Sequence, residues 1–156
     1  MNAIRVYADT SVFGGIHDDE FREPSRVFFE QVKGGQFVLV TSAVVQAEMA
    51  AAPPAVRRFF DEMLGFAELA DVTGNALDLR DAYVEAKIVT PKYSDDALHV
   101  ALATVIGCAV IVSWNFQHIV HFQKIPLYNA VNVLRGYQPI AIFSPREVIL
   151  YEDEGI

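Results

Sequence analysis

The sequence contains a single cysteine, no membrane-length apolar run and few basic residues, and each scarcity narrows the class of protein. Cys108 has no second cysteine with which to form an internal disulfide, and its apolar surroundings predict a small buried side chain. No apolar run approaches the roughly 20 residues that cross a bilayer. Asp9 interrupts the only early apolar segment, so the amino terminus lacks the pattern of a signal peptide. We therefore expect a soluble cytoplasmic protein with no membrane partner.

Basic residues are outnumbered, with 12 Lys and Arg against 20 Asp and Glu, for a net charge of −8. A surface of this charge repels nucleic acid as a whole. A protein of this composition that acts on a polyanion needs a local positive charge, and bound divalent cations are the obvious source.

The sequence does contain enough apolar material for a substantial core: 53% of its 156 residues are hydrophobic. Strand-like and helix-like segments alternate, with no internal repeat and no linker that divides the chain. The predicted strands cover residues 3–8, 37–40, 66–69, 108–113 and 140–143. The predicted helices cover residues 24–33, 43–51, 55–64, 75–86, 94–103, 116–122 and 128–135. This alternation predicts a single α/β domain over residues 1–156, with a parallel sheet of four or five strands and helices on both faces.

The helix predicted at residues 94–103 opens with a serine and two acids. Ser94 is a favourable N-cap residue, and the helix dipole favours the negative charges of Asp95 and Asp96 in the first turn. Two adjacent acids at a helix start usually serve only as capping residues. A functional role for them depends on acids elsewhere in the chain.

Three acids and one amide lie near the ends of predicted strands or within predicted helices. Asp9 follows a strand directly, Asn115 lies just beyond another, Asp96 is at a helix start, and Glu48 lies one to two turns into the helix after the second strand. In parallel sheets, ligands gather beyond the carboxyl ends of the strands. Carboxylates brought together repel one another and raise one another's pKa, which favours a bound cation. Oxygen ligands suit Mg²⁺ or Mn²⁺, and hydrolysis of a phosphodiester is chemistry that needs such an ion.

Four segments, in order along nearly the whole chain, carry a resemblance to a known family: Tyr7–Val12, Ala47–Met49, Asp96–Ala103 and Val112–Phe116. The chain resembles the PIN-domain ribonucleases, and most of all the VapC-like toxins of type II toxin–antitoxin systems. Each segment alone is a weak match, whereas their order, the chain length and the α/β alternation together are fairly specific.

The resemblance implies a PIN-like three-layer sandwich and Mg²⁺- or Mn²⁺-dependent cleavage of RNA, with the metal bound by Asp9, Glu48 and Asp96. It also implies a cognate antitoxin as partner and a homodimer. Many members of the family have an aspartate where this chain has Asn115. A neutral amide can orient water or ligate weakly but cannot act as a charged ligand, so the number of metals stays open.

Five further residues are candidates for a supporting role. Thr10 and Ser113 can donate hydrogen bonds to ligating carboxylates, although purely structural roles fit them equally well. Asp95 is a cap or a neighbour of the ligands. His99 fits a packed or hydrogen-bonded helix residue better than a catalytic one, and Lys92 is positioned to contact substrate phosphate.

Simpler interpretations also remain. Asp9 can merely cap the turn through Thr10 and Ser11, and His118 with His121 can suggest a histidine metal site. A non-catalytic interaction module with the same fold is an alternative, prompted by Asn115 and the acidic composition. A phosphoryl-transfer or receiver-type domain is a weaker one, because the segment after Asp9 lacks a second aspartate two residues on.

Overall fold

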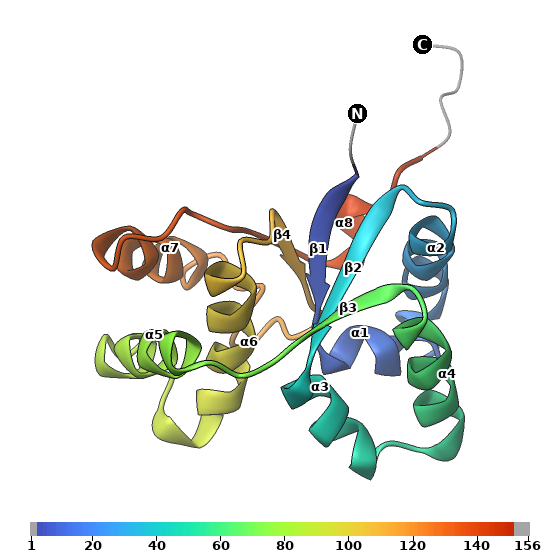
Figure 1. Ribbon diagram of the computed structural model, residues 1–156, viewed down its shortest axis with the longest axis horizontal. Coiled ribbons are helices and arrows are strands. Elements are labelled where there is room, and N and C mark those ends of the chain that lie inside the picture. Colours follow the sequence, from blue (N-terminus) through green and yellow to red (C-terminus); the bar gives the residue numbers. More distant parts are fainter. Residues whose placement is uncertain (1–2, 152–156) are drawn as a thin grey trace.

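The computed structural model describes residues 3–151 and contains five parallel strands between two layers of helices (Figure 1). The strands are β1 (Ile4–Ala8), β2 (Phe37–Ser42), β3 (Ala67–Ala70), β4 (Val110–Val112) and β5 (Ala141–Phe143). Their order is β3-β2-β1-β4-β5, and each neighbouring pair is parallel. This is the α/β sandwich with a parallel sheet of four or five strands that the sequence predicts.

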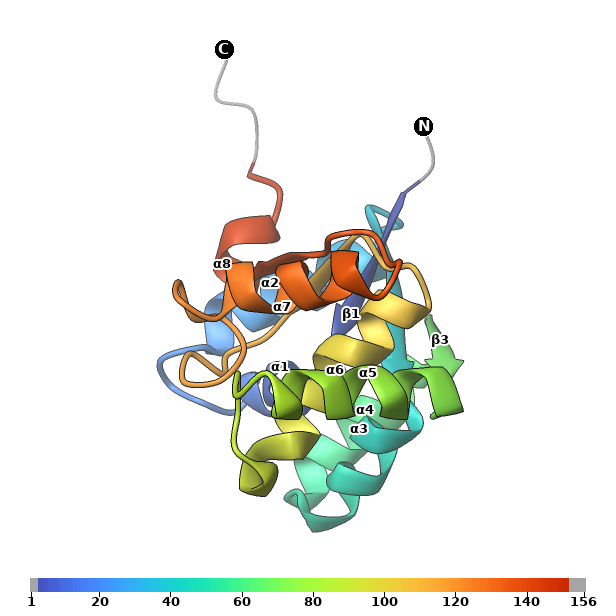
Figure 2. The ribbon, with the colours of Figure 1, turned by 90° about the vertical axis from the view of Figure 1, so that its left-hand side faces the viewer.

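Helices cover both faces of the sheet. The helices are α1 (Thr10–Gly15), α2 (Arg22–Lys33), α3 (Ala43–Glu48), α4 (Pro54–Leu64), α5 (Gly74–Glu85), α6 (Ser94–Val105), α7 (Ile125–Leu134) and α8 (Pro145–Val148). Short 3₁₀ turns, η1 (Met49–Ala51) and η2 (Pro91–Tyr93), follow α3 and precede α6. Figures 1 and 2 show α5, α6 and α7 on one side of the sheet and α1, α2 and α4 on the other.

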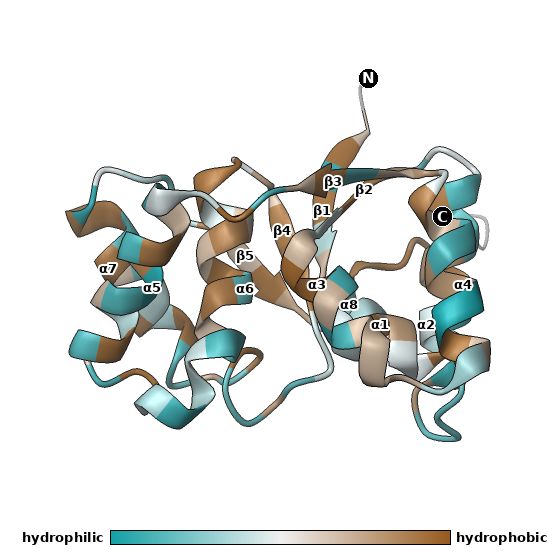
Figure 3. Cartoon of the chain, turned by 60° about the horizontal axis from the view of Figure 1, so that its bottom comes forward, coloured by the Kyte–Doolittle hydropathy of each residue, from teal (hydrophilic) through white to brown (hydrophobic). Residues whose placement is uncertain are grey.

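Burial on both faces explains the apolar strands. Val6 to Ala8 of β1 and all of β4 are buried, because parallel strands between two helix layers meet no solvent. Helix α6 is also buried over eight consecutive residues, Ala97 to Thr104, since it packs against α5 and β4. In Figure 3 these central elements are mostly hydrophobic, while α2, α4 and α5 carry hydrophilic outer surfaces.

The strand order places the carboxyl ends of two central strands, near which the candidate residues are predicted, side by side in the middle of the sheet. The chain moves outward from β1 through β2 to β3 and then returns to the other side of β1 to form β4 and β5. The carboxyl ends of β1 and β4 therefore flank the point at which the strand order reverses, where open α/β sheets bind their ligands. The register pairs Ala8 with Val112, so Asp9 and Ser113 leave the sheet side by side.

Two local predictions are wrong. Residues 116–122 form turns instead of a helix, and one reason is that the His118 carbonyl accepts a hydrogen bond from the Tyr128 hydroxyl. Ser94 is not an N-cap, because its backbone is already helical (φ −60°, ψ −28°) where η2 runs directly into α6. The predicted helices also omit α1, which Asp9 starts as N-cap residue.

Within residues 3–151, the structure contains no helix that is both long and apolar enough to cross a membrane.

Candidate active site

Asp9 lies at the carboxyl end of β1 and is held by hydroxyl groups from two elements. Its Oδ1 accepts hydrogen bonds from the Ser11 backbone N–H at 3.1 Å and from Ser11 Oγ at 2.6 Å. Its Oδ2 accepts one from Ser113 Oγ at 2.6 Å. Burial raises the pKa of Asp9, although the positive character of His99 and these hydroxyl groups oppose that rise. Asp9 therefore caps α1, as the simpler interpretation expects, and is also a buried acid at the reversal point of the sheet.

Glu48 is the last residue of α3, which Ser42 caps at its start. Its Oε1 accepts a hydrogen bond from Thr10 Oγ1 at 2.6 Å and lies 2.7 Å from His99 Nε2. The Glu48 side chain remains 36% exposed. Burial raises the pKa of Glu48, but the hydrogen bond and charge of His99, together with Thr10, outweigh it and leave this pKa below its ordinary value.

His99 is buried on α6 and is held at both ring nitrogens. Nε2 faces Glu48, and Nδ1 lies 2.8 Å from the hydroxyl of Tyr7, which is itself 2.8 Å from Ser42 Oγ. Burial lowers the pKa of His99, but the Glu48 hydrogen bond and the charges of Asp9, Glu48 and Asp96 raise it above its ordinary value. The charges of all three predicted acids thus act on one histidine, and Glu48 contacts it directly, in agreement with the expected packed or hydrogen-bonded role of His99.

Asp96, in the first turn of α6, contacts a histidine that the predicted site omits. Its Oδ2 lies 2.8 Å from His118 Nδ1. From sequence, His118 is a candidate only together with His121, as a histidine metal site. The signal that could have found it is its position three residues after Asn115, in the turn that follows a central strand.

Three of the five supporting candidates join this network, and two do not. Thr10, Ser113 and His99 each contact one of the acids directly. Asp95 is exposed and makes no side-chain hydrogen bond within residues 3–151. Lys92 is exposed on η2 with its Nζ 5.5 Å from the centre of the Tyr93 ring.

The donor chemistry of the site suits a hard divalent cation, whereas its present arrangement is a hydrogen-bonded one. The acids offer carboxylate oxygens, which Mg²⁺ and Mn²⁺ prefer. In the described part of the chain, Glu48 Oε2 and Asp96 Oδ1 accept no hydrogen bond from protein. Over the same residues 3–151, no three His, Cys, Asp or Glu side chains lie close enough together to hold one ion as they stand.

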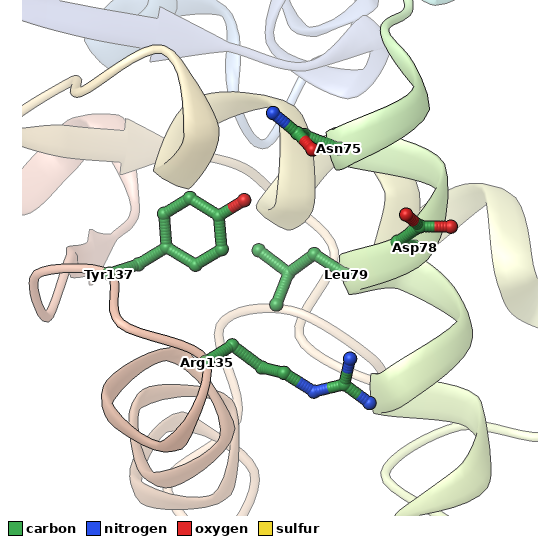
Figure 4. A pocket seen from close by; sticks show the side chains of 5 residues that line it. All are labelled: Asn75, Asp78, Leu79, Arg135 and Tyr137. Atoms are coloured by element: carbon green, nitrogen blue, oxygen red, sulfur yellow. The ribbon is translucent and has the colours of Figure 1, made fainter.

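A cavity elsewhere in the molecule shares no residue with this site. It has a volume of about 160 Å³ and is lined by Asn75, Asp78, Leu79, Arg135 and Tyr137. In Figure 4, Arg135 and Tyr137 reach from the end of α7 toward α5. The cavity therefore lies between α5 and the end of α7 on one side of the sheet, away from Asp9, Glu48 and Asp96.

Comparison with known proteins supports the fold and leaves the family open. No protein-family model and no curated protein sequence matches the chain. Among solved structures, the chain is similar to the crystal structure of VapBC2 from Rickettsia felis, described as bound to a DNA fragment from their promoter. The TM-score is 0.60 at 14% sequence identity, covering 89% of this chain and 97% of the other. The two proteins therefore share the PIN-like fold.

Proposed function

We propose that the chain is a metal-dependent endoribonuclease that hydrolyses RNA phosphodiester bonds and acts as the toxin of a toxin–antitoxin pair. The observation that carries this proposal is that Asp9 lies at the reversal point of the sheet and that Glu48 is held by Thr10, the neighbour of Asp9, and by His99, three residues after Asp96 on α6. Asp9 is buried, and an unpaired acid is costly to maintain in a core. Such a cost is explained if the acid takes part in the reaction.

We propose Mg²⁺ or Mn²⁺ as the cofactor, held by oxygens of the three acids. When bound, the ion activates water and stabilises the charge that develops on the transferring phosphoryl group. The chain's own hydroxyls and histidines orient the acids: Ser11 and Ser113 hold Asp9, and Thr10 holds Glu48. A cation at this place also offsets the net charge of −8 where a polyanion approaches.

The same proposal includes partners and location. The fold shared with VapBC2 and the resemblance to VapC-like toxins support a cognate antitoxin protein as partner, a homodimer, and a place in the cytoplasm. Light scattering of the purified chain alone tests for the homodimer. The same measurement with the product of a small neighbouring gene tests for the complex with an antitoxin.

Cleavage of labelled RNA by the purified chain in Mn²⁺, in Mg²⁺ or in EDTA tests the function. We expect cleavage with either ion, none in EDTA, and none by Asp96→Asn. The matched control is Asp95→Asn, because Asp95 is the adjacent acid and lies outside the hydrogen-bond network. If antitoxin-free wild type leaves varied RNAs intact with both ions, the chain is instead a non-catalytic interaction module with this fold.

A further inference from the structure

A single turn connects Asp9 to Asp96 through an unbroken series of hydrogen bonds. Ser113 Oγ donates to Asp9 Oδ2 at 2.6 Å and accepts from the Asn115 backbone N–H at 2.9 Å. Asn115 Oδ1 accepts from the His118 backbone N–H at 2.9 Å. His118 Nδ1 then lies 2.8 Å from Asp96 Oδ2. The turn after β4 thus bridges two of the three acids.

The amide oxygen of Asn115 is used inside this turn. A side-chain oxygen that accepts from the backbone N–H three residues on is a local bond that fixes the turn's shape. The chain therefore reaches Asp96 with the ring of His118 and not with the side chain of Asn115.

The ring of His118 is held firmly in place. It packs against Tyr93 at 4.0 Å between ring centres, and its side chain is only 10% exposed. Its carbonyl accepts a hydrogen bond from the Tyr128 hydroxyl at 2.7 Å. Because a carboxylate only accepts hydrogen bonds, Nδ1 carries a proton and donates a hydrogen bond to Asp96.

We propose that His118 is a positioning residue for Asp96, and that Asn115 acts through His118 by fixing the turn that carries it. This inference rests on the proposed function for the role of Asp96, while the hydrogen bonds themselves do not depend on that function. Groups that orient a ligating side chain typically change metal affinity or activity by about 10- to 100-fold when they are removed.

Paired variants separate removal of a group from its conservative replacement. Asn115→Ala removes the acceptor, whereas Asn115→Ser keeps a hydroxyl oxygen near the same place. His118→Leu removes the donor, whereas His118→Asn keeps an N–H near the position of Nδ1. His121→Ala is the matched control, because His121 lies in the same loop and its ring accepts a hydrogen bond only from the Gln123 backbone N–H among the described residues.

Mn²⁺ binding is the first measurement, with a thermal melt to confirm that each variant folds. We expect Asn115→Ala and His118→Leu to weaken binding by about tenfold or more, with partial recovery in the Ser and Asn variants. The double variant Asn115→Ala, His118→Leu should bind Mn²⁺ no more weakly than His118→Leu alone, because both changes break the same link from the turn to Asp96. Losses that add, or wild-type affinity in His118→Leu, overturn the proposal.

Side-chain ¹⁵N NMR of His118 in EDTA is the second measurement and does not depend on activity. We expect a proton on Nδ1 in the wild type and a changed signal in Asn115→Ala. If the wild type neither binds Mn²⁺ nor cleaves RNA, the proposed function fails, and the NMR result still decides the positioning role. An unprotonated Nδ1, or an Asn115→Ala spectrum identical to wild type, contradicts it.

Discussion

His99 Nε2 lies 2.7 Å from Glu48 Oε1, while the other nitrogen of the same ring lies 2.8 Å from the Tyr7 hydroxyl. The pair connects a long buried helix, α6, to the end of the short helix α3. Glu48 is thereby oriented from a rigid element, although its own helix has only six residues. This geometry has a consequence for stability as a function of pH.

Replacing His99 by Gln, which has no charge at any pH, should flatten the pH dependence of the melting temperature. The pKa of His99 is raised above 6.5, so its contribution is complete below 6.5 and is lost as pH rises through the folded pKa. The pKa of Glu48 is lowered below 4.5, so its contribution is lost as pH falls through the folded pKa. The melting temperature of wild type should exceed that of His99→Gln by most between about pH 4.5 and pH 6.5.

The expected advantage there is on the order of 1 kcal/mol, below the usual value for charged hydrogen bonds because solvent screens the partly exposed Glu48. Circular dichroism melts of both proteins over this pH range measure it. A difference that does not vary with pH would show that the charge of His99 contributes nothing to the fold.

Asp9→Asn should stabilise the protein at neutral pH and abolish its activity. The raised pKa of Asp9 means that stability falls as pH rises from 3.8 through the folded pKa, and an amide avoids this cost. Asn can still accept the hydrogen bonds of Ser11. We expect a melting temperature about 2–4 °C higher at pH 7, as for about 1 kcal/mol in a chain of this size. A lower melting temperature for Asp9→Asn at neutral pH contradicts this explanation.

Two adjacent glycines of α1 should respond in opposite ways to Ala. A Cβ on Gly15 would lie 2.5 Å from Ser25 Oγ and 2.9 Å from Trp114 Nε1, whereas a Cβ on Gly14 meets nothing within 4 Å. We expect Gly15→Ala to cost about 1–3 kcal/mol through overpacking. Gly14→Ala should raise the free energy of unfolding by as much as about 1 kcal/mol, because Ala has a higher helix propensity than Gly.

Urea unfolding followed by the fluorescence of Trp114, the single tryptophan, measures both effects. Trp114 stacks on Phe21 at 4.2 Å and donates to Ser25 Oγ at 2.9 Å, so its emission reports on this contact. Equal stability of the two glycine variants would mean that the contact at Gly15 relaxes without cost.

The layout of the fold could be predicted because the spacing of apolar residues and the positions of capping and turn residues agree along the chain. Apolar runs of strand length predict β1, β2 and β4, and the helix starts at Ser42 and Pro54 follow ordinary capping chemistry. Prediction is wrong where tertiary contacts decide local structure. The Tyr128 hydroxyl donates a hydrogen bond to the His118 carbonyl. The 3₁₀ turn before α6 places Ser94 in a helical backbone conformation, whereas an N-cap residue needs an extended one.

The acids of the candidate site and two of their hydroxyl partners, Thr10 and Ser113, could be proposed from sequence, but the histidine pairings could not. Asp9 follows a central strand, and Glu48 and Asp96 lie on helices that pack beside the same end of the sheet. The pairing of His99 with Glu48 spans 51 residues, and that of His118 with Asp96 spans 22. Such pairings depend on side-chain direction after folding, which periodicity does not encode.

A Mn²⁺ titration of single variants tests most directly whether Asp9 after β1, Glu48 of α3 and Asp96 of α6 act as one site. Asp9→Asn, Glu48→Gln and Asp96→Asn should each lower Mn²⁺ affinity by about tenfold or more, while Asp95→Asn stays close to wild type. Wild-type affinity in all three variants, or an equal loss in Asp95→Asn, would contradict the account.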